Sequence, residues 1–394
     1  MKRATWTHWA TTRDLSDFEV AVHDAGTGLE GEALGEVQFG GQFCFDPFDA
    51  YRAKLVSNPN MVIAGAIGAG KSTIAKMLIR RGLLNNRHVF VVDPKGEYLE
   101  LAQQSGGAVI VLGVNGWCDP FPKDVAESKV LVQSLLATSQ GSALSSGQLY
   151  ELEKAWSQLD GIRPPRVLQS LFNSVAPALD KDDNPDRRSL ALQLHRFVAG
   201  DLAKLFDGDG SPLTFSSRFT VLDLSAHWSS PSLPVLLLGA IALAQQSVAQ
   251  PGTQGYLVLD EAWSLMASAH ALAWLQGSWK LARARGLSHI LILHRWSDSE
   301  SVGDAGTKER SRAAGLLKEC ETVWLFRQPL DEANQITGAL GLSQLERSYL
   351  TAVPKGTALV RFGIYRSIVR VVPNHLDEGV INTDQAMSAD TTII

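Results

Sequence analysis

The chain has 394 residues, of which 45% are hydrophobic and 20% charged, as in a globular protein large enough for about two or three packed units. These proportions exclude a disordered, collagen-like or disulfide-stapled chain. With 36 basic and 41 acidic residues the formal net charge is −5, so no overall basic excess indicates a nucleic-acid-binding protein. The cysteines are widely spaced and form no CxxC pair, which predicts free thiols and no zinc site.

Residues 1–58 predict a short β-rich lead-in, because the apolar pieces Phe18–Val22, Glu36–Phe39 and Gln42–Phe45 alternate there with glycine clusters. The N-terminal residues lack the apolar core of a signal peptide. The longest apolar stretch, Leu233–Ala244, is shorter than the roughly 20 residues that a membrane span needs. We therefore expect a buried helix at this stretch, no transmembrane segment and a cytoplasmic location.

From Met61 onwards, apolar runs of strand length alternate with segments of helical spacing, which predicts an α/β fold with a mostly parallel sheet. The expected strands are Met61–Ala64, His88–Val92, Ala108–Leu112, Phe219–Leu224, Tyr256–Leu259, Ile290–Leu293, Thr322–Phe326 and Ala358–Phe362. Between the third and fourth of these strands the apolar spacing is helical only. We therefore expect an α/β core at 59–122 and 206–372, an inserted all-α subdomain at 123–205 and a C-terminal tail at 373–394.

The stretch GAIGAGKS, from Gly65 to Ser72, satisfies the phosphate-loop pattern G-x-x-x-x-G-K-[ST]. An apolar strand enters the loop and a helix leaves it. Glycines let backbone N–H groups turn towards phosphate oxygens, and the helix N-terminus adds partial positive charge. We predict that this loop binds ATP, with Lys71 at the β- and γ-phosphates and Ser72 as a ligand of Mg²⁺. The predicted nucleotide-binding residues are Gly65, Ala66, Ile67, Gly68, Ala69, Gly70, Lys71, Ser72 and Thr73.

Two acidic residues, Asp260 and Glu261, directly follow the apolar strand Tyr256–Leu259. We predict that Asp260 holds the Mg²⁺ shell and that Glu261 orients and activates the attacking water. Taken alone, Glu261 could instead be a carboxylate placed at a helix start by the helix dipole. Combined with the phosphate loop, the pair predicts an ATP-hydrolysing enzyme.

The segment VVDPKGEY, Val91 to Tyr98, carries two further acidic candidates, Asp93 and Glu97. An acidic group at the carboxyl end of a parallel strand faces the crevice in which ligands bind. Asp-Pro and Lys-Gly are also ordinary turn dipeptides. The sequence favours neither interpretation over the other.

The strand Ile290–Leu293 is flanked by two candidate site residues. His294 follows it, and we predict that this histidine senses the γ-phosphate, with a hydrogen-bonded structural histidine as the alternative. Arg283 precedes the strand, and we take it as the first candidate for an arginine that completes the site of a neighbouring subunit. Arg285 and Arg327 come second.

The run Leu144–Gln148, LSSGQ, mimics the signature of ABC transporter ATPases. In those proteins the acidic strand follows the signature closely, whereas Asp260 lies far downstream. We therefore interpret LSSGQ as the start of a helix in the inserted subdomain.

The motifs GAIGAGKS, VVDPKGEY, LFDG (Leu205–Gly208) and VLDEAW (Val258–Trp263) together resemble the HerA–FtsK superfamily. Within it they look most like the large cytoplasmic ATPase of conjugative transfer and type IV secretion systems. The resemblance covers roughly residues 40–372. It implies a RecA-like P-loop NTPase core with an inserted helical bundle, which assembles into hexamers around shared nucleotide sites. ATP hydrolysis would then drive substrate transfer or pilus biogenesis.

The resemblance also implies partners: further copies of the chain, the channel components of the apparatus, and a peripheral position on the inner face of the membrane. The sequence departs from the family in having only about 58 residues before the phosphate-loop strand, and in having His294 where glutamine is usual. One alternative is a DNA-translocating or DNA-processing ATPase, with Lys308–Arg312 (KERSR) as a candidate DNA contact. Another is a non-hydrolysing nucleotide-dependent scaffold, against which the intact Glu261 argues.

Overall fold

The computed structural model describes residues 27–381, apart from residues 39, 113, 160, 182–183, 209–210, 214–216, 249–251, 262–267, 298–314, 318 and 378. The expected strand Phe18–Val22 and the basic run Lys308–Arg312 lie outside the described residues. The same holds for Ala262 and Trp263 at the end of VLDEAW.

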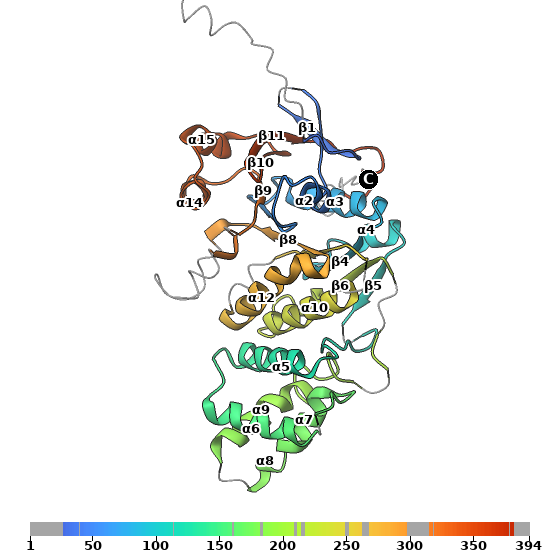
Figure 1. The fold of residues 1–394 in the computed structure, drawn as a ribbon, viewed down its shortest axis with the longest axis vertical. Helices are drawn as coiled ribbons and strands as arrows, with labels where there is room; N and C mark the ends of the chain where they lie inside the picture. The colour runs from blue at the N-terminus through green and yellow to red at the C-terminus, as the bar shows by residue number, and fades with distance from the viewer. Residues whose placement is uncertain are drawn as a thin grey trace, which may run out of the picture.

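One large sheet organises the described chain (Figure 1), with strand order β2-β1-β11-β10-β9-β3-β8-β7-β4-β6-β5. Its central and far strands, from β9 to β5, pair in parallel throughout. They are β9 (Thr322–Leu325), β3 (Met61–Ala64), β8 (Leu287–Leu293), β7 (Gly255–Leu259), β4 (His88–Asp93), β6 (Phe219–Asp223) and β5 (Ala108–Val111). This result confirms the predicted α/β class and its mostly parallel sheet.

The remaining strands extend the sheet on the β9 side in antiparallel pairs. They are β10 (Thr357–Phe362), β11 (Tyr365–Val371), β1 (Ala33–Val37) and β2 (Gln42–Cys44). The two lead-in strands therefore join the main sheet through β11. We did not expect β11, because its exposed residues interrupt the apolar run that marks the buried strands.

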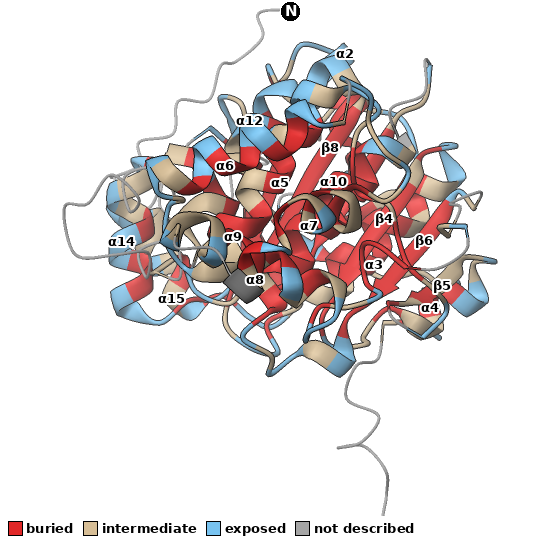
Figure 2. Cartoon of the chain, turned by 90° about the horizontal axis from the view of Figure 1, so that it is seen from below, coloured by how far each residue is buried: buried red, intermediate tan, exposed pale blue. Residues whose placement is uncertain are grey.

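Helices cover both faces of the sheet. One face carries α2 (Pro47–Arg52), α3 (Lys71–Leu84) and α4 (Leu99–Gln104), and the other carries α10 (Leu233–Val248) and α12 (Ala269–Arg285). In β3 the side chains alternate between the two cores, with Met61 and Ile63 in one and Val62 and Ala64 in the other. Strands covered on both sides are apolar at every position, and Figure 2 shows them buried between the helical layers.

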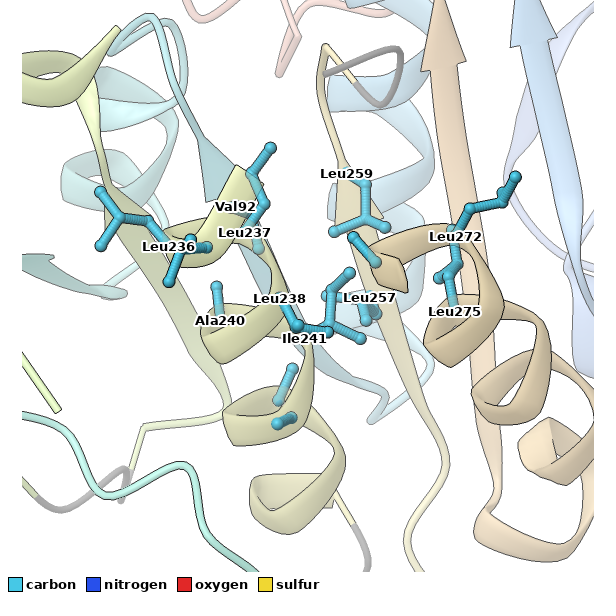
Figure 3. Close-up of a cluster of buried hydrophobic side chains, with 14 of the residues drawn as sticks. Val92, Leu236, Leu237, Leu238, Ala240, Ile241, Leu257, Leu259, Leu272 and Leu275 are labelled. Carbon is cyan, nitrogen blue, oxygen red and sulfur yellow. The ribbon is translucent and has the colours of Figure 1, made fainter. Parts of the chain in front are cut away.

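The apolar stretch at 233–244 is a buried helix, as expected. In the close-up of Figure 3, Leu237 of α10 lies beside Val92 of β4 and Ile241 beside Leu257 of β7. Leu272 and Leu275 of the neighbouring α12 belong to the same buried cluster. Burying such a side chain fully contributes about 1.5–3 kcal/mol. Among the helices that the structure describes, none is long and apolar enough to cross a membrane.

The chain between β5 and β6 is helical and forms the lower lobe in Figure 1. Its helices are α5 (Val125–Gln140), α6 (Ser146–Ser157), α7 (Val167–Val175), α8 (Ala178–Lys181) and α9 (Pro185–Val198). The Ser145 side chain caps α6 by accepting from the Gln148 N–H, and the Ser145 backbone N–H donates to Oε1 of Gln148, a capping box. The interpretation of LSSGQ as a helix start is thereby confirmed. The exact domain boundaries stay a prediction.

Two more helices, α14 (Leu330–Leu340) and α15 (Gln344–Ala352), lie between β9 and β10. The polar segment that follows β11 is attached to α3 by ionic contacts. The buried Asp377 carboxylate accepts hydrogen bonds from Arg81 at 2.5 and 2.8 Å, and Lys76 Nζ donates to the carbonyl oxygen of Val380 at 2.8 Å. The chain up to residue 381 thus lies along the helix that begins at Lys71.

We expect Asp377→Ala to lower the free energy of unfolding by about 3 kcal/mol, because the variant leaves the buried Arg81 guanidinium with a longer ion pair, at 3.7 Å, to the exposed Glu32. Glu36→Ala is the matched control, since Glu36 pairs with Arg370 at the surface, and such a pair contributes less than about 1 kcal/mol. Chemical denaturation measures both changes. Equal losses in the two variants would contradict a stabilising role for the buried pair.

Candidate nucleotide-binding site

The predicted phosphate loop connects β3 to α3 at the edge of the sheet where the parallel strands end. Gly70, the N-cap of α3, has a φ of +119°, a conformation that glycine adopts without strain. Gly65 lies so close to Phe326 that an added Cβ would come within 2.6 Å of the Phe326 Cβ. The path of the loop therefore requires glycine at both positions.

Main-chain hydrogen bonds hold the loop from two sides. The Ala66 N–H donates to the carbonyl oxygen of Arg327, just after β9, and the Gly356 N–H donates to the carbonyl oxygen of Ala69, each at 2.9 Å. Gly356 belongs to the turn that leads into β10. The loop is thus fixed by segments more than 250 residues away in the sequence.

Lys71, the first residue of α3, is buried beneath the loop. Its Nζ donates to the carbonyl oxygens of Gly65 at 2.7 Å and Ala66 at 3.0 Å. Burial lowers the pKa of Lys71 to about 8, although Asp260 and Glu261 act in the opposite direction. Because burial penalises the charged ammonium, an anionic group in the loop would offset that penalty.

Negative charge is concentrated beside the loop, at the end of β7. Asp260 is buried, and that burial raises its pKa to about 7, with Glu97, Glu261 and Asp93 acting in the same direction. A divalent cation would neutralise this charge. No cluster of three or more His, Cys, Asp or Glu side chains among the described residues is arranged to hold a metal. Mg²⁺ is usually bound by one or two carboxylates together with substrate phosphates. Asp260 and the start of α3 at Ser72 could hold such an ion.

Asp93, the last residue of β4, forms the turn that follows it. Its carboxylate accepts backbone N–H groups of Lys95, Gly96, Glu97 and Tyr98 at 2.8 to 3.2 Å. Burial raises the pKa of Asp93 and these hydrogen bonds lower it, with burial the larger effect. The turn interpretation therefore accounts for Asp93. Its partner in the motif, Glu97, lines the cleft described below.

Glu261 lies at the centre of a group of ionisable side chains. Its carboxylate is buried, and the same oxygen, Oε1, contacts Lys95 Nζ and His294 Nε2. The backbone of Glu261 has a φ of +55°, a strained conformation for a residue other than glycine and one that clusters at functional sites. The site thus unites Glu261 from the end of β7 with His294 from the end of β8.

Sequence reasoning missed Lys95. The motif VVDPKGEY indicates a site through its acidic residues, whereas its lysine looks like part of a turn. The available signal was its place directly after β4, at the edge where the strands end. The distance of 3.4 Å between Lys95 Nζ and His294 Nε2 depends on the sheet order, which the sequence does not state.

Lys71, Lys95 and His294 line one cleft of about 440 Å³, whereas the buried Asp260 and Glu261 are not among its lining residues. The cleft has a size that suits a small-molecule ligand. Its lining residues are Ile67, Gly68, Gly70, Lys71, Ser72, Thr73, Lys95, Glu97, His294, Lys355 and Ile381. The structure therefore brings the exposed part of the phosphate loop, the acidic motif and His294 together.

The three candidate arginines lie apart. Arg283 is exposed in the last turn of α12 and donates to the carbonyl oxygen of Ser57 at 3.4 Å. It precedes β8, whereas His294 follows that strand, whose seven residues span about 20 Å. Arg285 donates to Gln245 at 2.7 Å. Arg327 is exposed beside the phosphate loop, which its carbonyl oxygen contacts. Arg283 thus takes no part in the site of its own chain. Its role in a neighbouring subunit's site stays a prediction.

Comparison with known proteins supports the fold. Residues 53–240 match the family model described as Helicase HerA, central domain. This part of the chain therefore resembles the central domain of HerA proteins. The chain has a large, mostly parallel sheet, and its likeness to solved structures confirms the RecA-like P-loop fold expected from its sequence.

Among the solved structures that resemble this chain, VirB4 from Thermoanaerobacter pseudethanolicus aligns with a TM-score of 0.79 at 22% identity, covering 90% of this chain and 100% of that one. The plasmid coupling protein TrwB with a non-hydrolysable ATP analogue aligns with a TM-score of 0.59 at 16% identity, covering 88% and 90%. The protein TraC of Escherichia coli (strain K12) is 23% identical over 268 residues, which are 64% of this chain and 31% of TraC. The chain thus spans about a third of the length of that curated relative.

Proposed function

We propose that the chain is the ATP-hydrolysing motor of a conjugative transfer or type IV secretion apparatus. The observation that carries the proposal is the likeness to VirB4, which covers 90% of this chain and 100% of that structure. The proposal is also supported by the position of Lys71, Asp260 and Glu261 at one edge of the sheet. The similarity to TraC supports the same system.

In this proposal the phosphate loop binds the triphosphate of ATP, with Lys71 at the β- and γ-phosphates. Mg²⁺, held by Ser72 and Asp260, would neutralise charge that develops on the phosphates. Glu261 orients a water molecule for attack on the γ-phosphorus and accepts its proton, while ADP leaves. Structures of TrwB with ADP and Mg²⁺ and with an ATP analogue support these ligands.

We further propose that the motor assembles as a homo-oligomer, by analogy a hexamer, whose nucleotide sites lie between subunits. Its partners would be channel components of the apparatus, with a peripheral position on the cytoplasmic face of the membrane. DNA is the alternative substrate, because the coupling protein TrwB shares the fold.

We expect the purified chain to release phosphate from ATP in the presence of Mg²⁺ and to lose that activity when EDTA removes the metal. A phosphate-release assay measures both, and sedimentation gives the oligomeric state. Binding of ATP without any turnover would contradict the motor and favour the scaffold. Strong stimulation by duplex DNA that weakens with salt would favour the DNA-translocating alternative.

A further inference from the structure

The ammonium of Lys95 makes contacts that have no role in the reaction proposed above. Its ammonium touches the Glu261 carboxylate, lies 3.4 Å from His294 Nε2 and sits 5.1 Å from the centre of the Trp228 ring. The side chain is 31% exposed, whereas that of Glu261 is only 2% exposed. Lys95 therefore bridges a buried carboxylate and the open cleft.

The backbone of Lys95 is fixed, so only its side chain can respond to a ligand. The Asp93 carboxylate binds the N–H groups of Lys95 and of the three residues that follow it. The lysine side chain has four rotatable carbon–carbon bonds beyond that fixed point. Its ammonium can move within the cleft without any change in the sheet.

A general base must have a free carboxylate oxygen to accept a proton from water. In the structure Oε1 of Glu261 is engaged by Lys95 and His294. A triphosphate places new negative charge in the cleft that Lys95 and Lys71 line. The Glu261 carboxylate and the γ-phosphate would then compete for the same ammonium.

We propose that Lys95 couples binding of the γ-phosphate to release of the catalytic base. Before a triphosphate binds, Lys95 holds Glu261 through its ion pair. When the γ-phosphate enters, the ammonium moves to it and leaves Oε1 of Glu261, which can then orient water while His294 stays in contact with it. The proposal rests on the proposed ATP hydrolysis and adds a substrate-contacting residue to it. Its distinctive consequence is discrimination between ATP and ADP, because only ATP carries the γ-phosphate.

The chain supplies a close control in Lys129 of α5. Lys129 pairs with Glu153 at 2.6 Å, its side chain is 30% exposed, and its ammonium lies 6.0 Å from the Trp156 ring. Like Lys95, Lys129 therefore lies near a carboxylate and a tryptophan, but it belongs to the helical lobe, away from the cleft. Lys95→Met and Lys129→Met remove matched charges from a carboxylate and a tryptophan.

The test compares the affinities of a non-hydrolysable ATP analogue and of ADP, both with Mg²⁺, by calorimetry on the full chain. We expect Lys95→Met to weaken the ATP analogue by about tenfold or more, the effect of losing a charge-assisted hydrogen bond. ADP affinity should be unchanged. Lys95→Arg should restore most of the loss, and Lys129→Met should alter neither affinity. Equal weakening of both nucleotides by Lys95→Met, or of neither, would overturn the proposal.

A second measurement tests the competition itself. In the Glu261→Gln background Lys95 no longer has its carboxylate partner, so the ATP analogue should bind more tightly, by about threefold or more. This gain should disappear when Lys95→Met is added. An equal gain in affinity for the ATP analogue with and without Lys95 would mean that Glu261 acts only by repelling phosphate, and it would overturn the proposed competition. If the unaltered chain binds neither nucleotide, the proposed function itself fails, which is a separate outcome.

Discussion

Replacement of Lys71 by alanine is expected to abolish ATP hydrolysis and to weaken ATP binding by about a hundredfold or more, because two charge-assisted hydrogen bonds to phosphate are lost. The carbonyl oxygens of Gly65 and Ala66 already place this ammonium beneath the loop. Calorimetry with a non-hydrolysable ATP analogue measures the affinity, and phosphate release measures turnover.

The stability of the Lys71→Ala variant provides its control. Burial of Lys71 lowers its pKa to about 8, so its charged form is unfavourable in the folded chain without an anion. Removal of the ammonium relieves that penalty but takes a donor from the carbonyl oxygens of Gly65 and Ala66. The two effects oppose each other, so the melting temperature should change by only a few degrees. A folded variant that keeps its affinity for ATP would contradict the assignment of the phosphate loop.

Glu261→Gln is expected to reduce turnover by about a hundredfold or more while the variant still binds ATP, because glutamine keeps the shape of the side chain but cannot accept the proton. Single-turnover hydrolysis measures the chemical step apart from binding. The accumulation of bound, uncleaved ATP would be the direct observation.

Glu151→Gln is the matched control for Glu261→Gln. Glu151 is also a buried carboxylate with a basic neighbour, Arg187, at 3.8 Å, but it lies in the helical lobe. Its replacement should leave turnover within about twofold, because it does not touch the reacting groups. Normal turnover in Glu261→Gln would instead leave the site without its proposed base.

The parallel part of the fold could be predicted because its physical cause is local. Strands such as β3 and β4 are covered on both faces, so their sequences are apolar without interruption. The phosphate loop could be predicted for a similar reason, since Gly70 needs a positive φ that other residues avoid. The direction of parallel strands then places Asp260 and His294 at the same edge.

The remaining features depend on contacts between distant segments. β11 lies towards the antiparallel side of the sheet. Its sequence could not be recognised as a strand, because polar residues interrupt the apolar ones. Asp377 looks like a solvated tail residue until Arg81 is placed beside it. The position of Arg283 follows from the sequence order. Because Arg283 precedes the parallel strand β8, it lies at the edge of the sheet opposite to the carboxyl end of β8, which His294 follows.

The two cores on opposite faces of the sheet restrict how the molecule can change during a catalytic cycle. Sliding one strand by a single residue would exchange the side chains of one core for those of the other. The spacing between the ends of β3, β4, β7 and β8 must therefore stay constant whichever nucleotide is bound. The sheet then acts as a rigid frame, and the work of hydrolysis has to leave the site through side chains, connecting loops and whole-subunit rotations.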